Sequence, residues 1–354
     1  MAIKVLMLGP DRRVHGGISG VVNNLYDAGI DKSVSVRYLA TMKEGSKLRK
    51  ALVACVAYLK FVACVSDYDV IHVNMASDFS YLRKAWFIRK AYKKGKKIVL
   101  HQHGGDWLGY YNTLNTRQRQ RVVQVFNMAN RVLVLSPYYL DFFKNVVKIE
   151  SKIDLFPNKI AIPDEVSRVE HEGINILFLG RICKAKGVDE LIDAVAKVRE
   201  KFPKINLRLA GIYEDTSFED KIEKNSDFIT YLGWVGDKDK DEELRKCDIF
   251  VLPSYFEGQG VSVLEAMVYG CPVIATNVGG IPMMIDDHET GLLVEAKSSE
   301  AISKAIYEIL TDDTLRNEIK IRARSKIERE FDIKDVVEKL TSIYEEVIGT
   351  GIDD

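Results

Sequence analysis

Two short apolar segments with the same pattern organise the chain. The segments IKVLMLG (residues 3–9) and INILFLG (residues 174–180) both follow the pattern I-x-[VI]-L-x-L-G. Continuous apolar runs are typical of parallel strands that are covered on both faces. A closing glycine permits a tight turn from a strand into a helix. Two such openings in one chain predict two Rossmann-like units.

Short apolar segments continue to alternate with longer amphipathic segments behind each opening. In the first half we expect strands at residues 35–39, 70–73, 97–101 and 131–135, with helices after Gly20 and at 48–65, 80–94 and 117–129. In the second half we expect strands at 174–179, 206–210, 228–232 and 249–251, with helices at 188–201, near Glu219 and at 241–246. This alternation predicts parallel sheets and an α/β fold.

Chain length and a polar segment near the middle predict two domains. The 354 residues exceed what one hydrophobic core usually serves. We expect a Rossmann-like domain over residues 1–163, a linker over 164–173 and a second Rossmann-like domain over 174–330. The last segment, residues 331–354, is expected to be a helix that packs back on the first domain.

Charge divides the chain into two unlike halves although the net charge is zero. Residues 1–170 contain 27 Lys and Arg against 14 Asp and Glu, whereas residues 171–354 contain 24 against 37. A basic half joined to an acidic half indicates different partners for each. The composition, 47% apolar and 29% charged, excludes a disordered or fibrous protein.

The cysteines and the apolar segments predict a cytoplasmic protein. The five cysteines are Cys55, Cys64, Cys183, Cys247 and Cys271. No two form a CxxC pair, which favours buried thiols in a reducing compartment over a disulfide framework or a zinc site. No signal peptide is recognised, and Arg49, Lys50 and Lys60 interrupt the apolar run 48–65.

Two glutamates eight positions apart mark the strongest candidate site. Glu257 and Glu265 flank the turn Gly258-Gln259-Gly260, and a helix is expected to begin near Val261. Backbone N–H groups at a helix start that follows a glycine turn are well suited to a diphosphate.

This stretch resembles the E-x7-E signature of family 4 retaining glycosyltransferases. FLGRICKAKGVDELIDA (residues 178–194) is similar to the Arg/Lys motif of the same family. The resemblance covers nearly the whole chain. It implies the GT-B fold, with two Rossmann-like domains facing across a cleft, and transfer of a sugar from a nucleotide-sugar donor with retention of configuration. The donor is then a substrate, and neither a cofactor nor a metal ion is expected.

The resemblance also implies roles for matching residues of the second half. Glu257 would hold the transferred sugar and Glu265 the ribose hydroxyls. Arg181 and Lys186 would pair with the diphosphate, where fixed cations stabilise the charge that develops on the leaving group. The donor-binding residues expected in this half are Gly211, Gly258, Gln259, Gly260, Val261 and Glu265.

Two loops of the first half resemble further parts of the family's site. The loop VHGGISG (residues 14–20) resembles the family's amino-terminal loop, which would bring Gly16 and Gly17 to the donor phosphate. In HQHGGD (residues 101–106), His103 would face the donor sugar as a catalytic residue, and Asp106 would bind acceptor hydroxyls. Both loops follow strands, and ligands of open α/β sheets bind at strand ends.

Simpler structural roles compete with these assignments. Ser262-x-x-Glu265 also matches a capping box, in which Glu265 would only cap its helix. Arg181 and Lys186 could be ordinary surface cations, and His103 a structural histidine. Asp237-Lys238-Asp239 matches the D-x-D of metal-dependent transferases, but it lies in a run of lysines and acids typical of a solvated helix start.

Basic segments of the first half indicate an acceptor at a membrane. Residues 83–97 contain eight cations and no acid, and the expected helix 48–65 combines cations with apolar residues. We hypothesise peripheral contact with the anionic inner face of the cell membrane and a lipid-linked saccharide acceptor. The competing interpretation makes 48–65 a core helix with solvated lysines. Nucleic acid is not an expected partner, because no recognition motif appears.

The resemblance implies a function in cell-surface polysaccharide synthesis, since the sequences around HQHGGDW and EGQG are similar to capsule, exopolysaccharide and O-antigen transferases. Gln259 departs from the aromatic residue of the family's E-G-F-G form. We expect transfer of a hexose or N-acetylhexosamine from a UDP-sugar. The alternatives are a GDP-mannose-dependent mannosyltransferase, a nucleotide-sugar 2-epimerase and a non-catalytic nucleotide-sugar-binding protein.

Overall fold

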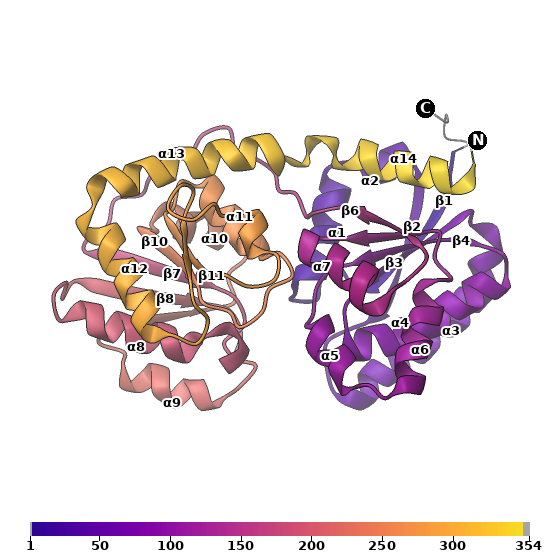
Figure 1. The fold of residues 1–354 in the computed structure, drawn as a ribbon, viewed down its shortest axis with the longest axis horizontal. Coiled ribbons are helices and arrows are strands. Elements are labelled where there is room, and N and C mark those ends of the chain that lie inside the picture. Colours follow the sequence, from indigo (N-terminus) through magenta and orange to yellow (C-terminus); the bar gives the residue numbers. More distant parts are fainter. Residues whose placement is uncertain (1, 350–354) are drawn as a thin grey trace. The chain divides into compact units, whose positions relative to one another are not determined.

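The computed structural model describes residues 2–349, which divide into two compact units (Figure 1). The first unit holds the described residues up to Ala161 and those from Ile333 onward, and the second holds Ile162–Asp332. Residues 164–173, expected as a linker, are counted with the second unit.

The first unit is a six-stranded parallel sheet with helices on both faces. Its strands are β1 (Lys4–Pro10), β2 (Ser35–Met42), β3 (Val70–Met75), β4 (Lys97–Gln102), β5 (Arg131–Val134) and β6 (Lys152–Leu155). Its helices before the second unit are α1 (Gly17–Asp27), α2 (Ile30–Ser33), α3 (Lys47–Cys64), α4 (Asp78–Lys93), α5 (Trp107–Thr113), α6 (Thr116–Phe126) and α7 (Pro137–Asp141). The strand order is β2-β1-β3-β4-β5-β6, and every neighbouring pair is parallel.

The second unit repeats this architecture with the strand order β12-β11-β10-β7-β8-β9, again parallel throughout. Its strands are β7 (Ile174–Leu179), β8 (Ile205–Ala210), β9 (Ile229–Gly233), β10 (Ile249–Leu252), β11 (Val273–Thr276) and β12 (Leu292–Val294). Its helices are α8 (Val188–Arg199), α9 (Ser217–Lys224), α10 (Asp237–Arg245), α11 (Val261–Val268), α12 (Ser299–Thr311) and α13 (Asp313–Glu330). The predicted parallel α/β sheets are confirmed.

The two strands that open the units are buried as their patterns predict. Residues 5–8 of β1 and 176–178 of β7 have no exposed surface. Burial on both faces is possible because helices cover both sides of each sheet. The sequence analysis missed β6, β11 and β12, which have only three or four residues each.

The last helix, α14 (Val336–Ile348), packs on the first unit and lies near α2 (Figure 1). Its apolar side chains join the core that underlies β1, β3 and β4. Tyr344 also places its hydroxyl 2.6 Å from Nδ1 of the buried His72 on β3. A second polar tie joins Glu346 of α14 to Arg131 of β5 as an ion pair. The first unit therefore contains residues from both ends of the chain, and the second unit lies between them in the sequence.

Helix α3 is not the core helix that one interpretation of residues 48–65 predicts. Only Ala57 and Phe61 of its 18 residues are buried. Leu48 and Leu59 are 81% and 70% exposed. The helix packs against the edge strand β2 and against α4, so the fold covers one narrow face of it and leaves the other open.

Candidate functional site

Two expected site residues of the second unit, Lys186 and Glu257, meet at the carboxyl ends of β7 and β10, which are neighbours in the sheet. Lys186 follows β7, and its Nζ forms an ion pair with Oε1 of Glu257, which follows β10. The hydroxyl of Ser254 donates to the same oxygen at 2.7 Å. Both partners of the pair are mostly buried, with 18% and 12% of their side chains exposed. The fold thus holds a cation and a carboxylate together at the sheet edge where α/β proteins bind ligands.

Close backbone contacts fix the loop that carries Glu257. Gly279, just after β11, has a φ of +55°, and a Cβ there would lie 1.9 Å from the carbonyl oxygen of Glu257. Gly280 donates its N–H to that oxygen at 3.0 Å. Only glycine tolerates both this conformation and this approach. The sequence analysis missed this support together with the strand β11 that precedes it.

Helix α11 begins where the glycine turn ends. Gly258 and Gln259 are buried, Gly260 is the N-cap residue with a φ of 76°, and Val261 is the first helical residue. No side chain caps this helix start. No side chain therefore competes for the first N–H groups of α11, which directly follow the glycine turn. The diphosphate hypothesis requires such uncapped N–H groups.

The capping-box interpretation of Glu265 is wrong, because Ser262 lies inside α11 rather than at its N-cap. The carboxylate of Glu265 instead accepts a hydrogen bond from Nζ of Lys240 on α10 at 2.7 Å. Lys240 also lies 3.6 Å from Asp237. Nothing in the sequence indicated this partner, since 25 residues separate Lys240 from Glu265.

Arg181 stands apart from the buried pair. Its Nη1 lies 2.7 Å from both carboxylate oxygens of Glu214, and just over half of its side chain is exposed. Gly211 directly follows β8, and a Cβ there would lie 1.7 Å from the carbonyl oxygen of Gly180, directly before Arg181. Gly211 therefore shapes the backbone at Arg181 by close approach.

The glycine loop of the first unit is open at the start of α1. Gly16 is the N-cap residue and Gly17 the first helical residue, and both are exposed. A Cβ at either position would meet nothing within 4 Å. No side chain caps this helix start, so its N–H groups are available for a ligand.

Asn74 fixes the ring of His103. The amide nitrogen of Asn74 donates to the carbonyl of Leu8 at 3.1 Å, which turns its Oδ1 toward His103 Nε2 at 2.6 Å. Nε2 must therefore carry the proton, and Nδ1 is the acceptor nitrogen. Nδ1 is buried and finds no hydrogen-bond partner within residues 2–349. Burial lowers the pKa of His103 well below its usual value, and the neighbouring His72 and Lys84 add to the shift.

The sequence analysis missed Lys84, which is fully buried on α4. Its nearest hydrogen-bond partner is the Ser80 hydroxyl at 3.4 Å. Burial lowers the pKa of Lys84 well below its usual value, and Arg83 lowers it further. Helical spacing could have identified this residue, because Lys84 shares the buried stripe of α4 with Tyr81, Ile88 and Ala91.

The acidic candidates lie at the starts of two helices. Asp106 is the N-cap residue of α5, and its Oδ1 accepts the N–H of Gly109 at 2.7 Å. Asp237 and Asp239 lie in the first turn of α10, where their negative charges interact favourably with the helix dipole. Within the described part of the chain, no group of three or more His, Cys, Asp or Glu side chains is arranged to hold a metal ion.

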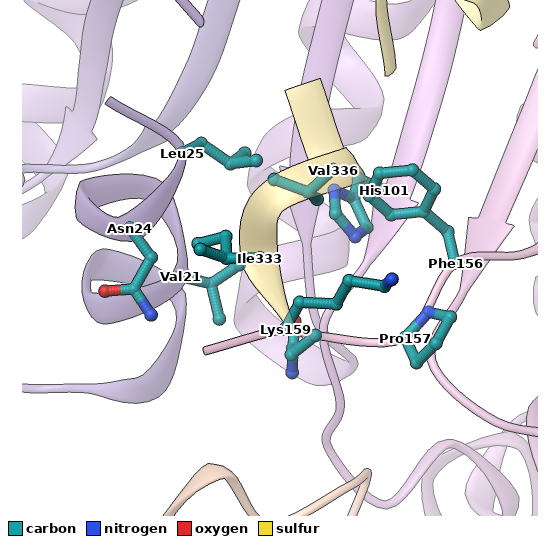
Figure 2. Close-up of a pocket in the computed structure, with 10 residues that line it drawn as sticks. Val21, Asn24, Leu25, His101, Phe156, Pro157, Lys159, Ile333 and Val336 are labelled. Atoms are coloured by element: carbon teal, nitrogen blue, oxygen red, sulfur yellow. The ribbon is translucent and has the colours of Figure 1, made fainter. Parts of the chain in front are cut away.

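A small cavity in the first unit is too small for a sugar (Figure 2). Its lining includes Leu25 from α1, His101 from β4, Phe156 after β6, and Ile333 and Val336 near the start of α14. The centre of a water molecule can move within about 10 Å³ of this cavity. That volume is near the lower limit for holding one water. We therefore assign no substrate to it.

No helix among residues 2–349 is long and apolar enough to cross a membrane.

Family models match both units. Residues 24–162 match the model described as Glycosyltransferase Family 4, and residues 163–326 match Glycosyl transferases group 1. A relative from Klebsiella pneumoniae, described as an uncharacterized 41.2 kDa protein in the cps region, is 26% identical over 94% of this chain and 97% of that protein. The phosphatidyl-myo-inositol mannosyltransferase of Mycobacterium leprae is 31% identical over 51% of this chain and 48% of that protein.

Solved structures share the fold over nearly the full length. Sucrose-phosphate synthase from Thermosynechococcus elongatus superimposes with a TM-score of 0.82 at 18% identity, covering 99% of this chain and 100% of that chain. HepE from Anabaena, in complex with UDP and glucose, superimposes with a TM-score of 0.77 at 17% identity, covering 97% and 100%.

Proposed function

This chain belongs to the family 4, group 1 glycosyltransferases and has the GT-B fold, and from that premise we propose which sugar it transfers and how. The proposed reaction moves a hexose or N-acetylhexosamine from a UDP-sugar to a lipid-linked saccharide, with retention of configuration and without a metal ion. The observation that carries the proposal is the ion pair between Lys186 and Glu257 at the ends of β7 and β10.

Lys186 and Arg181 supply the charge that the proposed reaction needs. When the bond between the sugar and the diphosphate breaks, the leaving nucleoside diphosphate gains negative charge. Fixed cations stabilise that charge most strongly in the transition state. Amide groups at the start of α11 add donors for the same phosphates. These groups can perform the work that a divalent cation performs in metal-dependent transferases.

Glu257 fits an orienting role better than a nucleophilic one. Its Oε1 is occupied by Lys186 and by the Ser254 hydroxyl, both of which stabilise the carboxylate and reduce its nucleophilicity. We therefore propose that the acceptor oxygen attacks the sugar on the face that the diphosphate leaves. The bond from the anomeric carbon to the acceptor oxygen forms as the bond to the phosphate oxygen breaks, and the acceptor's proton passes to that phosphate oxygen.

The donor and pathway rest on relatives. HepE is described in complexes with UDP and with UDP-glucose, which favours a uridine nucleotide here. The Klebsiella relative from a cps region favours capsule synthesis. The mannosyltransferase relatives favour a second candidate, a mannosyl donor. The first unit would then receive the acceptor, with Asp106 binding its hydroxyls and with His103 and the loop of Gly16 and Gly17 facing the donor.

A thermal-shift screen with UDP, UDP-sugars, GDP and GDP-mannose, each with and without EDTA, tests the donor. A ligand at 100 times its Kd adds about 2.7 kcal/mol to the free energy of unfolding. We expect UDP and its sugars to raise the melting temperature equally with and without EDTA. A shift with guanosine nucleotides alone would support the mannosyl donor instead. No shift with any nucleotide would contradict the assignment of the donor site.

Replacing Glu214 should release Arg181 for the diphosphate. We expect Glu214→Gln to tighten UDP binding by up to about fivefold, because an exposed ion pair of up to about 1 kcal/mol no longer competes for the guanidinium. Isothermal titration of UDP measures this. Asp220→Asn removes the same charge from α9 nearby and serves as the control. Unchanged or weaker binding in Glu214→Gln would show that Arg181 does not exchange Glu214 for the nucleotide.

A further inference from the structure

Exposed apolar side chains of this protein are concentrated on two neighbouring helices. Eight of the sixteen most exposed large apolar residues within 2–349 belong to α3 or α4. They are Leu48, Leu52, Val56, Leu59, Phe79, Leu82, Trp86 and Tyr92. Phe79 is 82% exposed and Trp86 65%. Single exposed apolar residues are ordinary, but a contiguous group of this kind marks an interaction surface.

The exposed residues form one stripe on each helix. On α3, Leu48, Leu52 and Leu59 are separated by four and seven positions, which places them on one face. That stripe runs for roughly 16 Å at 1.5 Å per residue. On α4, Phe79, Leu82 and Trp86 recur at three and four positions.

Aromatic packing joins the two stripes into one surface. Tyr58 of α3 meets Trp86 edge to face, with ring centroids 6.4 Å apart, and meets Phe87 at 5.3 Å. Phe87 and Phe61 form the buried contact between the helices, with their ring centroids 5.1 Å apart. Figure 1 shows α3 and α4 side by side at the same end of the first unit. We call the exposed faces of these two helices the α3–α4 surface.

Cations surround the apolar part of the α3–α4 surface. Helix α3 carries Lys47, Arg49, Lys50 and Lys60, all exposed, and no acid. Helix α4 has Asp78 as its one acid, at its first residue, and its stripe continues into the half-buried Lys90 and the exposed Lys93. Apolar side chains on a helix face that is edged by lysine and arginine are the pattern of helices that lie in a membrane interface. Aromatic residues such as Trp86 favour the same depth.

We propose that the α3–α4 surface docks on an anionic lipid bilayer, with its leucine and aromatic side chains among the acyl chains and its cations on the headgroups. Charge complementarity selects this occupant, because a negatively charged sheet of headgroups meets all of these cations at once. The inference rests on the proposed function in one respect: a lipid-linked acceptor lies in such a bilayer. Its test measures binding rather than sugar transfer, so either can fail without the other.

Co-sedimentation with lipid vesicles tests the proposal on the full chain. The vesicles contain about one-third phosphatidylglycerol in phosphatidylcholine, with pure phosphatidylcholine for comparison. We expect binding to the anionic vesicles at low salt, weaker binding at high salt and a blue shift of tryptophan emission that Trp86→Phe removes. The combined variant Leu48→Gln/Leu52→Gln/Leu59→Gln should bind about tenfold more weakly or worse. Its melting temperature and its shift with UDP should match the wild type, because all three side chains are exposed.

Two further variants separate apolar from electrostatic contact. Ile321→Gln removes an equally exposed apolar residue from α13 in the second unit and should not change vesicle binding. Lys50→Gln/Lys60→Gln/Lys93→Gln should weaken binding and reduce its dependence on salt. Absence of binding to the anionic vesicles at low salt would overturn the proposal. Undiminished binding by the variant that replaces the three leucines would also overturn it. A concentration-dependent dimer that the leucine variant abolishes, without vesicle binding, would assign the surface to a second copy of the chain.

Discussion

We expect Lys186→Ala to lower kcat about 100-fold or more, because the leaving diphosphate would lose a fixed cation that acts mainly in the transition state. Lys186 is the better of the two cations for this test. It is mostly buried beside Glu257, whereas Arg181 is exposed and paired with Glu214. Arg181→Ala should also cost turnover, but its exposed charge is more easily replaced by solvent. Steady-state rates with donor and acceptor, separated into kcat and KM, provide the measurement.

Lys184→Ala is the matched control for this prediction. Lys184 belongs to the same short turn as Lys186, Lys184–Lys186, but is exposed. Loss of Lys186 leaves the carboxylate of Glu257 partly buried without its cation, which lowers stability as well as turnover. The double variant Lys186→Met/Glu257→Gln removes both charges and should recover stability without recovering turnover. Near-wild-type kcat in Lys186→Ala would contradict the assigned role of this cation.

We expect the first unit to lose stability steeply between pH 7 and pH 5, because three of its histidines are held neutral. Burial lowers the pKa of His72 to about 3. Burial also lowers the pKa of His101 well below its usual value, with further lowering by His103 and His72, and His103 shifts the same way. The rings form one cluster, with centroids 5.4 Å apart for His72 and His101 and 3.9 Å for His101 and His103.

The sign follows from which state binds protons. Below pH 6.5 the unfolded chain protonates these histidines and the folded unit does not, so falling pH favours unfolding. His72 alone should cost about 2 kcal/mol between pH 7 and pH 5. His101 and His103 act in the same direction. The lowered pKa of Asp11, about 2, contributes only at more acidic pH.

Urea unfolding at a series of pH values measures this slope, with hydrogen exchange in β3 and β4 reporting on the first unit by itself. His72→Gln should reduce the slope by close to one proton even if it lowers stability at pH 7 through loss of the Tyr344 contact. His288→Gln, at an exposed histidine of the second unit, controls for the loss of an imidazole. A free energy of unfolding that stays constant from pH 7 to pH 5 would contradict the prediction.

Local sequence patterns predicted the fold correctly where only one structure buries the pattern. The apolar side chains of a continuous apolar strand leave water only when both faces of the strand are covered, and this predicted both parallel sheets. The strands β6, β11 and β12 escaped prediction, although β5 and β10 were found at the same length of four residues as β6 and β11. Shortness alone therefore does not explain the miss. Strand ends also located the Lys186 and Glu257 loops, since parallel strands bring their carboxyl ends to one edge.

The sequence by itself determined two parallel α/β units and the chain positions of the loops that we propose bind ligands. Only the tertiary structure decided what each side chain meets. Glu214 with Arg181, Lys240 with Glu265 and Asn74 with His103 are separated by 25 to 33 residues, and no local pattern encodes such pairs. The apolar stripe of α3 could equally have been core or surface. Its exposure was decided by which neighbours the fold supplies, because amphipathicity specifies a face to cover and not what covers it.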